Sequence, residues 1–263
     1  MRRREYLTMS HKEAVEICEA AERTINMNDY NTAIKLWLKA VKIFLKIDEK
    51  KEAAIILNKI GRTYDSQVMY KKAMKQYQKA LKISVKSGCR EIEGLTLNNI
   101  GKVYYAWGRH QKAMEHYQKA LGISKDTENN ELEGIILNNM GEVYTAWEMY
   151  KKAIEKFRKA LKIGKETGNR EIEETALSNI GAVYYYQGKY QEAIEQLQEA
   201  LQICRETKDK RGEGITLNNL GAVYRKLGRR QKAMEQFKKA LKISKKIGDR
   251  ELERITLSNM GSL

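Results

Sequence analysis

Apolar and polar residues alternate with helical spacing along the chain, and loops are short. Leu97, Ile100 and Tyr104 are separated by three and four positions, so they lie on one face of an α-helix. A second run with the same kind of spacing follows after a short break. The pattern predicts one helix over residues 90–107 and another over residues 110–127.

This helix pair is a repeat unit, because the same residue types return every 40 positions. The glycine column is Gly61, Gly101, Gly141, Gly181, Gly221 and Gly261. The alanine column is Ala40, Ala80, Ala120, Ala160, Ala200 and Ala240. Where helices cross, such small residues let the backbones approach closely, while larger neighbours fill the space beside them. We expect six helix pairs and a final helix, thirteen helices in all.

The repeat predicts one elongated domain over residues 1–263, with no linker. Its expected units are 10–49, 50–89, 90–129, 130–169, 170–209 and 210–249, with a terminal helix over 250–263. One pair cannot bury its apolar face alone, so neighbouring units must stack. The chain contains no proline, as expected if it is almost entirely helical.

Helix ends are marked by glycine and by capping residues. Turn glycines are expected at Gly88, Gly108, Gly168, Gly188, Gly228 and Gly248, where a positive φ is needed. Asn169 and Asp249 follow two of them and are expected to cap the next helix. Glu171 and Glu251 favour the positive N-terminal end of the same helices.

The repeat resembles a known family. Leu57-x2-Ile60-Gly61-x2-Tyr64, followed by Ala73-x3-Tyr77, is similar to the tetratricopeptide pattern, and it recurs over nearly the whole chain. The usual tryptophan is replaced by leucine, the inter-repeat proline is missing, and the period exceeds the usual length of about 34 residues. These departures resemble the long-repeat branch that includes kinesin light chains, G-protein-signalling modulators and prokaryotic arrays.

The resemblance implies an all-α fold, a right-handed α-solenoid of helix–turn–helix units. In this family the first helix of each unit lines a concave groove that binds a peptide or a partner helix. Two columns would face the groove: the aliphatic residues Ile55, Leu95, Ile135 and Ile215, and the asparagines Asn58, Asn98, Asn138 and Asn218. Further groove positions are Arg62, Lys102, Tyr105, Glu142, Thr175, Ser178, Tyr185, Tyr186, Arg225 and Lys226.

Two roles are open for the asparagine column. A carboxamide both donates and accepts, so it can pair with the backbone of an extended peptide, or it can form hydrogen bonds between repeats. The adjacent column, Asn99, Asn139, Asn179, Asn219 and Asn259, is expected to bond to the neighbouring helix. The groove tyrosines are either aromatic contacts for a partner or exposed residues at a helix end.

Charge leaves the class of partner open. Lys and Arg number 50 against 34 Asp and Glu, a net charge of +16. Lysine gathers on the second helix of each unit, where it forms either a solvated surface or a basic stripe for RNA or DNA. The groove is most basic at Arg225 and Lys226, so a protein or peptide ligand with acidic residues is expected there. Self-assembly through the open repeat ends is a further alternative.

No catalytic, cofactor or metal motif can be identified. His11, His110 and His116 are scattered, and no cysteine or carboxylate cluster has metal-binding spacing. The sequence therefore predicts a binding protein without enzyme activity, cofactor or metal. Three dispersed cysteines and a basic start without an apolar stretch are typical of a cytoplasmic protein, and no window is apolar enough for a membrane span.

Overall fold

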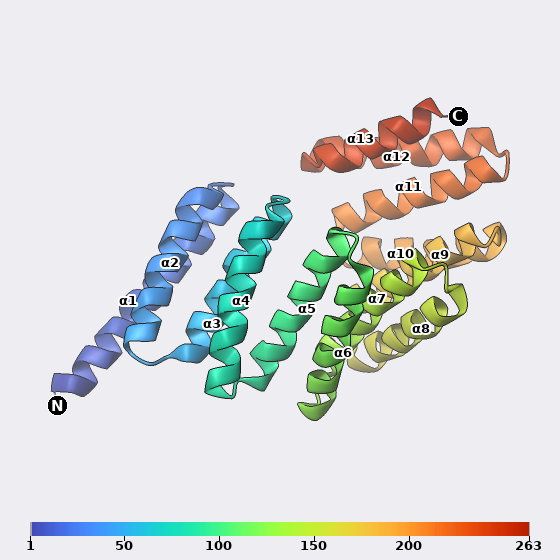
Figure 1. The fold of residues 1–263 in the computed structure, drawn as a ribbon. Helices are drawn as coiled ribbons and strands as arrows, with labels where there is room; N and C mark the ends of the chain where they lie inside the picture. The colour runs from blue at the N-terminus through green and yellow to red at the C-terminus, as the bar shows by residue number, and fades with distance from the viewer. Residues whose placement is uncertain (1, 263) are drawn as a thin grey trace. The chain divides into compact units, whose positions relative to one another are not determined.

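The computed structural model describes residues 2–262, which form thirteen α-helices (Figure 1). The helices are α1 (Arg2–Asn26), α2 (Tyr30–Lys46), α3 (Lys50–Ser66), α4 (Tyr70–Ser87), α5 (Arg90–Ala106), α6 (His110–Asp126), α7 (Asn130–Ala146), α8 (Tyr150–Thr167), α9 (Arg170–Tyr186), α10 (Tyr190–Glu206), α11 (Lys210–Lys226), α12 (Arg230–Ile247) and α13 (Arg250–Gly261). The all-α prediction is confirmed. The helices expected over 90–107 and 110–127 are α5 and α6, each ending one residue earlier than predicted.

Glycine turns and side-chain caps lie at the helix ends where the sequence predicts them. Gly88, Gly168 and Gly248 adopt the left-handed conformation and end α4, α8 and α12. Asn169 and Asp249 each accept a hydrogen bond from a backbone N–H of the next helix, at 3.1 Å and 3.0 Å. The predicted glycine turns and both predicted caps are confirmed.

The glycine column marks close helix contacts. A Cβ atom on Gly61 would lie 2.3 Å from Cε1 of Tyr77, and one on Gly141 would lie 2.4 Å from Cε1 of Phe157. Gly61, Gly101, Gly141 and Gly221 therefore make room for a ring on the second helix of the pair, and Gly181 makes room for Leu197. Only a residue without a side chain permits this approach.

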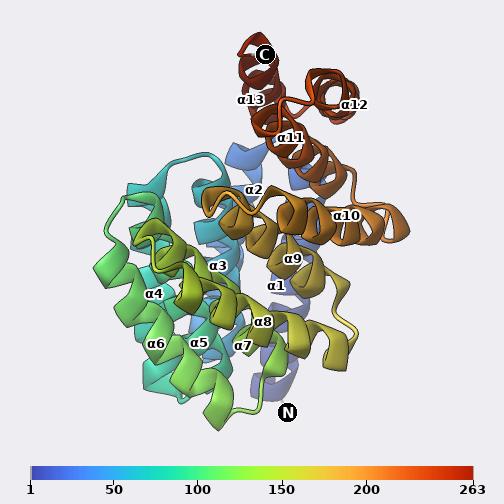
Figure 2. The ribbon, with the colours of Figure 1, turned by 90° about the vertical axis from the view of Figure 1, so that its right-hand side faces the viewer.

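The chain divides into two compact units, Met1–Leu132 and Glu133–Leu263. The first unit has a core of Trp37, Phe44, Leu57 and their neighbours. The second has cores around Phe157 and around Leu197. Within each unit, successive helices lie side by side in pairs (Figure 1, Figure 2).

Candidate functional site

The predicted groove columns differ in exposure. Ile55, Leu95 and Ile215 are half-buried and Ile135 is exposed. The four asparagines are buried: Asn58, Asn98, Asn138 and Asn218 are between 2% and 6% exposed. A ligand can reach the aliphatic column more easily than the carboxamides.

Asn58 is held between neighbouring repeats of the first unit. Its Nδ2 donates to the carbonyl of Ala54 at 3.1 Å and to Oγ1 of Thr96 at 2.7 Å. Its Oδ1 accepts from Nδ2 of Asn99 at 3.3 Å. Two of these three bonds cross to the next repeat, and the bond to Ala54 stays within α3.

The same bond recurs in the second unit, where Nδ2 of Asn259 donates to Oδ1 of Asn218 at 3.1 Å. The inter-repeat role expected for the column of Asn99 and Asn259 is confirmed at these two positions. The partner-binding role of Asn58 and Asn218 stays a prediction, and it would require these bonds to open.

One repeat interface lacks this bond. Oδ1 of Asn138 and Nδ2 of Asn179 are both buried, yet neither has a hydrogen-bond partner among the described residues. Nδ2 of Asn138 reaches only the carbonyl of Ile172, at 3.5 Å. The position that Thr96 fills in the first unit is taken here by Ala176, which offers no hydroxyl. This interface is therefore less well satisfied than its counterparts.

The predicted cationic groove residues are accessible. Arg62, Lys102 and Lys226 are exposed. Arg225 is half-buried, and its Nη1 donates to the carbonyl of Asn259 at 3.3 Å and to Oγ of Ser262. The Arg225 guanidinium is thus already engaged in hydrogen bonds within the protein.

Tyrosines cluster on the second unit. Tyr186 is 60% exposed, stacks on Tyr150 with ring centroids 6.4 Å apart, and meets Tyr185 edge-on at 5.7 Å. Tyr185 also contacts Tyr190, at 6.0 Å. In the first unit, Tyr105 stacks on His110 at 5.2 Å. Of these rings, that of Tyr186 is open enough to contact a partner without rearrangement.

A cavity with a volume of about 730 Å³ lies in the second unit. Residues of α7, α9 and α11, the first helices of three repeats, line it together with the loop that precedes α11. These are Glu142, Arg170, Glu171, Glu174, Thr175, Ser178, Asn179, Thr207, Asp209, Arg211, Gly212 and Ile215. Glu142, Thr175, Ser178 and Ile215 are among the groove positions predicted from the sequence, so four of them share one hollow.

Two exchanged residues shape this cavity. Glu174 occupies a position that is glycine at Gly94, Gly134 and Gly214. In those repeats a Cβ on the glycine would contact the apolar residue 38 positions later, such as Ile172 facing Gly134 at 3.0 Å. For Glu174 that facing residue is Gly212. A large acidic residue thus replaces a glycine, and a glycine replaces a large apolar residue.

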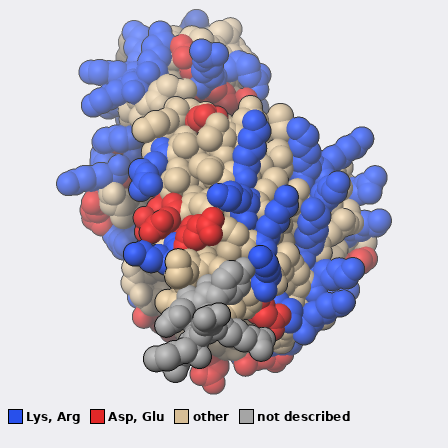
Figure 3. All heavy atoms as spheres, turned by 90° about the vertical axis from the view of Figure 1, so that its left-hand side faces the viewer, with Lys and Arg blue, Asp and Glu red and all other residues tan. Residues whose placement is uncertain are grey.

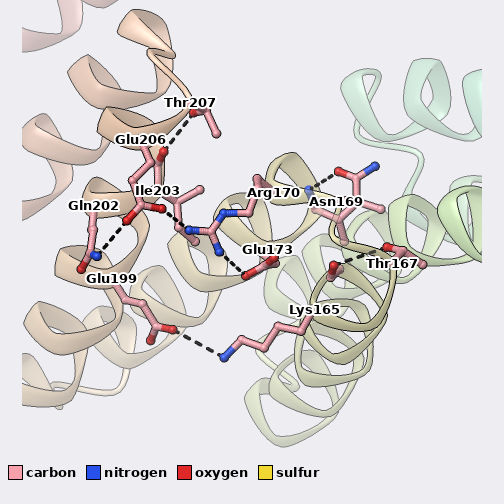
Figure 4. Close-up of polar contacts among 12 residues, drawn as sticks. Lys165, Thr167, Asn169, Arg170, Glu173, Glu199, Gln202, Ile203, Glu206 and Thr207 are labelled. Carbon is pink, nitrogen blue, oxygen red and sulfur yellow. Dashed lines mark hydrogen bonds and ion pairs between the residues drawn. The ribbon is translucent and has the colours of Figure 1, made fainter.

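The charges that line the cavity are unequal. Four carboxylates, Glu142, Glu171, Glu174 and Asp209, face two guanidinium groups. Both guanidiniums pair with acids that do not line the cavity. Arg170 binds Glu173 at 3.0 Å and also Glu206 (Figure 4), and Arg211 binds Asp249 at 2.9 Å.

Glu174 makes no ion pair with a described residue. Its carboxylate accepts from Oγ of Ser178 at 2.9 Å and from Oγ1 of Thr175 at 3.5 Å. Burial raises the pKa of Glu174, partly offset by the Ser178 hydrogen bond, and Asp209 raises it further. The carboxylate thus lies in an environment that lacks a counter-charge.

A second cavity, of about 490 Å³, lies in the first unit between α1 and α3. Arg62 lines it, as do Trp37 and Tyr30 of α2. Trp37 is only 4% exposed, and its Nε1 has no acceptor among the described residues. Each unit therefore has a hollow to which first helices of the repeats contribute, and in the first unit α2 contributes as well.

No catalytic centre emerges from the described residues. Burial raises the pKa of the Cys204 thiol to about 12, so this cysteine stays neutral and is not a nucleophile. Burial lowers the pKa of His116. No group of three His, Cys, Asp or Glu side chains in the described part could hold a metal ion. Within residues 2–262, no helix is apolar and long enough to cross a membrane.

The stacked helix pairs define a class of protein, the all-α repeat solenoid. Proteins of this class provide a scaffold for protein interactions. Family models agree. Residues 92–166 and 173–246 match the model described as tetratricopeptide repeat, which covers more than half of the chain. The chain belongs to the tetratricopeptide repeat family. Residues 3–90 match the model of soluble NSF attachment protein, SNAP.

Solved structures support the fold. BtubC (BKLC) from P. vanneervenii is 21% identical, covering 92% of each chain with a TM-score of 0.60. Aspartyl phosphate phosphatase F from Bacillus subtilis is 16% identical over 92% of this chain and 72% of that one, with a TM-score of 0.71. A Rap protein complexed with Competence and Sporulation Factor is 18% identical over 95% and 74%, with a TM-score of 0.70. No curated protein sequence matches the chain.

Proposed function

We propose that the chain is a scaffold that binds an extended peptide, or such a segment of a partner protein, on the face formed by the first helices of its repeats. The observation that carries this proposal is the cavity of about 730 Å³ between α7, α9 and α11. Its volume lies within the range of roughly 300–1,000 Å³ typical of ligand sites. It includes four positions that the family resemblance assigns to the groove.

The surroundings of this cavity suit a peptide. Ile215 and Thr175 offer apolar contact, and the exposed Ile135 continues the aliphatic column on α7. Nδ2 of Asn179 is a buried donor without an acceptor among the described residues, so it can take up a peptide carbonyl. The complex of a Rap protein with Competence and Sporulation Factor supports the analogy, since that structure shares the fold.

The other predicted contacts belong to the same proposal. On α5, a ligand would contact Leu95, Lys102 and Tyr105. On α3, it would contact Ile55 and Arg62. In the second unit, Tyr185 and Tyr186 would supply aromatic contacts, and Arg225 and Lys226 would meet acidic residues of a ligand. We propose a binding role and not a catalytic one.

A library of random 12-residue peptides displayed on phage tests this proposal. Enriched peptides are synthesised with a fluorescent label, and their affinity is measured by fluorescence anisotropy. Thr175→Trp fills the cavity, whereas Lys162→Trp places the same bulk on the exposed side of α8. We expect Thr175→Trp to weaken binding at least ten-fold and Lys162→Trp to leave it unchanged. Failure to enrich any peptide, or equal binding by both variants, would overturn the proposal.

A second candidate function is nucleic-acid binding, favoured by the basic surface. Lys and Arg side chains form rows across the face shown in Figure 3. Exposed lysines also follow one face of α4, at Lys71, Lys75 and Lys79. This function requires affinity for a single-stranded RNA that falls steeply with salt concentration. The probe is a 20-nucleotide poly(U) RNA. Nucleic-acid binding would be contradicted if the protein does not retain this RNA at about 50 mM salt, or if retention does not depend on the salt concentration.

A further inference from the structure

The cavity of the second unit has a chemical preference of its own. The chain as a whole carries a charge of +16, and yet this cavity is lined by four carboxylates and two guanidiniums. A cavity with excess negative charge attracts positively charged ligand groups, because its low-dielectric walls strengthen the local electric field.

The two arginines do not neutralise these carboxylates. Arg170 lies between Glu173 and Glu206, and Arg211 pairs with Asp249, so each guanidinium is bound by acids outside the cavity (Figure 4 shows Arg170). Asp209 caps α11 through the backbone N–H of Gly212 at 3.0 Å and makes no ion pair with a described residue. Glu174 likewise has hydroxyl partners but no cation. The charges of Glu174 and Asp209 are therefore available to a ligand.

The place opposite Glu174 in the repeat belongs to Gly212. Equivalent repeats have Ile92, Leu132, Ile172 and Leu252 at this position. A Cβ atom on Gly212 would lie 2.3 Å from Oδ2 of Asp209 and 3.0 Å from Sγ of Cys204. The Glu174–Gly212 exchange therefore replaces the packed apolar contact of other repeats by polar groups, with a half-buried carboxylate among them.

A second feature, at the neighbouring interface between α7 and α9, indicates a ligand. Asn138 is 3% exposed and its Oδ1 has no donor, while Nδ2 of Asn179, which lines the cavity, has no acceptor among the described residues. The corresponding pairs, Asn99 with Asn58 and Asn259 with Asn218, are bonded to each other. The unsatisfied donor beside the carboxylates suits a backbone carbonyl next to the ligand's charged side chain.

We infer that this cavity is a recognition pocket for a basic side chain, arginine or lysine, of the bound peptide, with Glu174 as its main counter-charge. This inference rests on the proposed function and names the residue type that the site selects. A metal ion fits less well, because no described group of three side chains could hold one and the volume far exceeds that of an ion. Arginine fits best because its planar guanidinium can bind a carboxylate with two parallel hydrogen bonds.

Four labelled nine-residue peptides test the inference. They share a Gly/Ser frame, blocked at both ends, and differ only in the central residue, which is Arg, Lys, Gln or Glu. Fluorescence anisotropy gives their dissociation constants, and the Ile215 methyl signals, assigned with Ile215→Val, report binding in the cavity by NMR. We expect the Arg and Lys peptides to bind at least ten-fold more tightly than the Gln peptide and to shift the Ile215 signals. The Glu peptide should bind least.

Variants separate this pocket from general electrostatic attraction. Glu174→Gln keeps the side-chain shape and should reduce the preference for Arg over Gln to less than two-fold. Glu166→Gln, an equal charge change at an exposed site of α8, should leave the preference intact. The double variant Glu174→Gly with Gly212→Ile restores the pattern of the other repeats and should also abolish the preference.

The results distinguish this inference from the proposed function. Equal binding of the Arg and Gln peptides, with Thr175→Trp still blocking both, would overturn the basic pocket and leave peptide binding standing. An Arg preference that survives both Glu174→Gln and the double variant would also overturn it. Absence of any peptide binding would overturn both proposals together.

Discussion

Asn259 donates a hydrogen bond from its side-chain Nδ2 to Oδ1 of Asn218, the asparagine 41 positions earlier, at 3.1 Å. Asn99 makes the same bond to Asn58 in the first unit, at 3.3 Å. Consecutive asparagines in the repeat therefore have complementary roles, because the first accepts from the following repeat and the second donates to the preceding one. The first-unit bond is buried and the second-unit bond is partly buried, so both help to fix the register of neighbouring helices.

Asn58→Ala should destabilise the chain more than Asn138→Ala. The first change leaves the side-chain amide of Asn99 without its acceptor and removes the donor to Thr96, which should lower the free energy of unfolding by about 1–3 kcal/mol. Asn138 makes only one long bond and has an unpaired Oδ1, so its replacement should cost less than about 1 kcal/mol.

Urea denaturation followed by circular dichroism measures both losses. Lys71→Ala, at an exposed site of α4, provides a control and should cost little. Equal losses for Asn58→Ala and Asn138→Ala would show that the inter-repeat bonds do not set this stability.

Two glycine substitutions should have opposite signs. Gly141→Ala places a methyl group against the ring of Phe157, at 2.4 Å from Cε1, and overpacking of this kind costs about 1–3 kcal/mol. Gly122 lies within α6, and a Cβ there meets nothing within 4 Å. Gly122→Ala should therefore stabilise the chain by roughly 0.5–1 kcal/mol, because alanine loses less backbone entropy in a helix. Thermal melting curves measure the change in stability of both variants. A stabilising effect of Gly141→Ala would contradict the close packing of Gly141 against Phe157.

The pH dependence of stability should report on Glu174. Its pKa in the folded protein is raised above the ordinary 4.5, so the folded state binds more protons than the unfolded state as pH rises above that value. Stability contributed by this group is thus present at low pH and is lost as pH rises through the folded pKa. Glu174→Gln should therefore melt higher than the wild type at pH 7, with the difference shrinking toward pH 4.

Melting temperatures at half-unit steps between pH 4 and pH 8 provide the measurement. Glu166→Gln is the matched control and should show no such trend. A difference that grows toward low pH would mean that Glu174 is stabilised as an anion in the folded protein.

The sequence predicts the helices well because their spacing is a local property. A 3.6-residue period, glycine turns and capping side chains are all contained within a few neighbouring residues, as at Gly168 and Asn169. The direction of the asparagines was harder to predict. A rotation of one residue about the helix axis, about 100°, decides whether Asn58 faces a groove or the next repeat, and the period alone leaves that rotation open.

The sequence indicates the cavity of the second unit only when two columns of the repeat are compared with each other. Glu174 interrupts a glycine column and Gly212 interrupts an aliphatic one. Each departure alone reads as a tolerated substitution. Their meaning depends on the fact that these columns face each other 38 positions apart, and contacts such as Gly134 with Ile172 establish this only in three dimensions.

Arg170 at the start of α9 should stabilise the second unit more than Arg90, at the start of α5, stabilises the first. Arg170 bridges Glu173 and Glu206, and Arg90 bridges Glu93 and Asp126 at 3.1 Å each. The Glu173 side chain is 5% exposed, against 16% for Glu93, so loss of its cation leaves a more deeply buried carboxylate unpaired.

Arg170→Gln should therefore lower the free energy of unfolding by about 1–3 kcal/mol, and Arg90→Gln by less than about 1 kcal/mol, since exposed pairs contribute little. Chemical denaturation at low and at high salt measures both. Salt should weaken the effect of Arg90→Gln more, because solvent ions screen the exposed pair but reach Glu173 poorly. If the two substitutions cost the same at every salt concentration, burial of Glu173 does not determine the strength of this bridge.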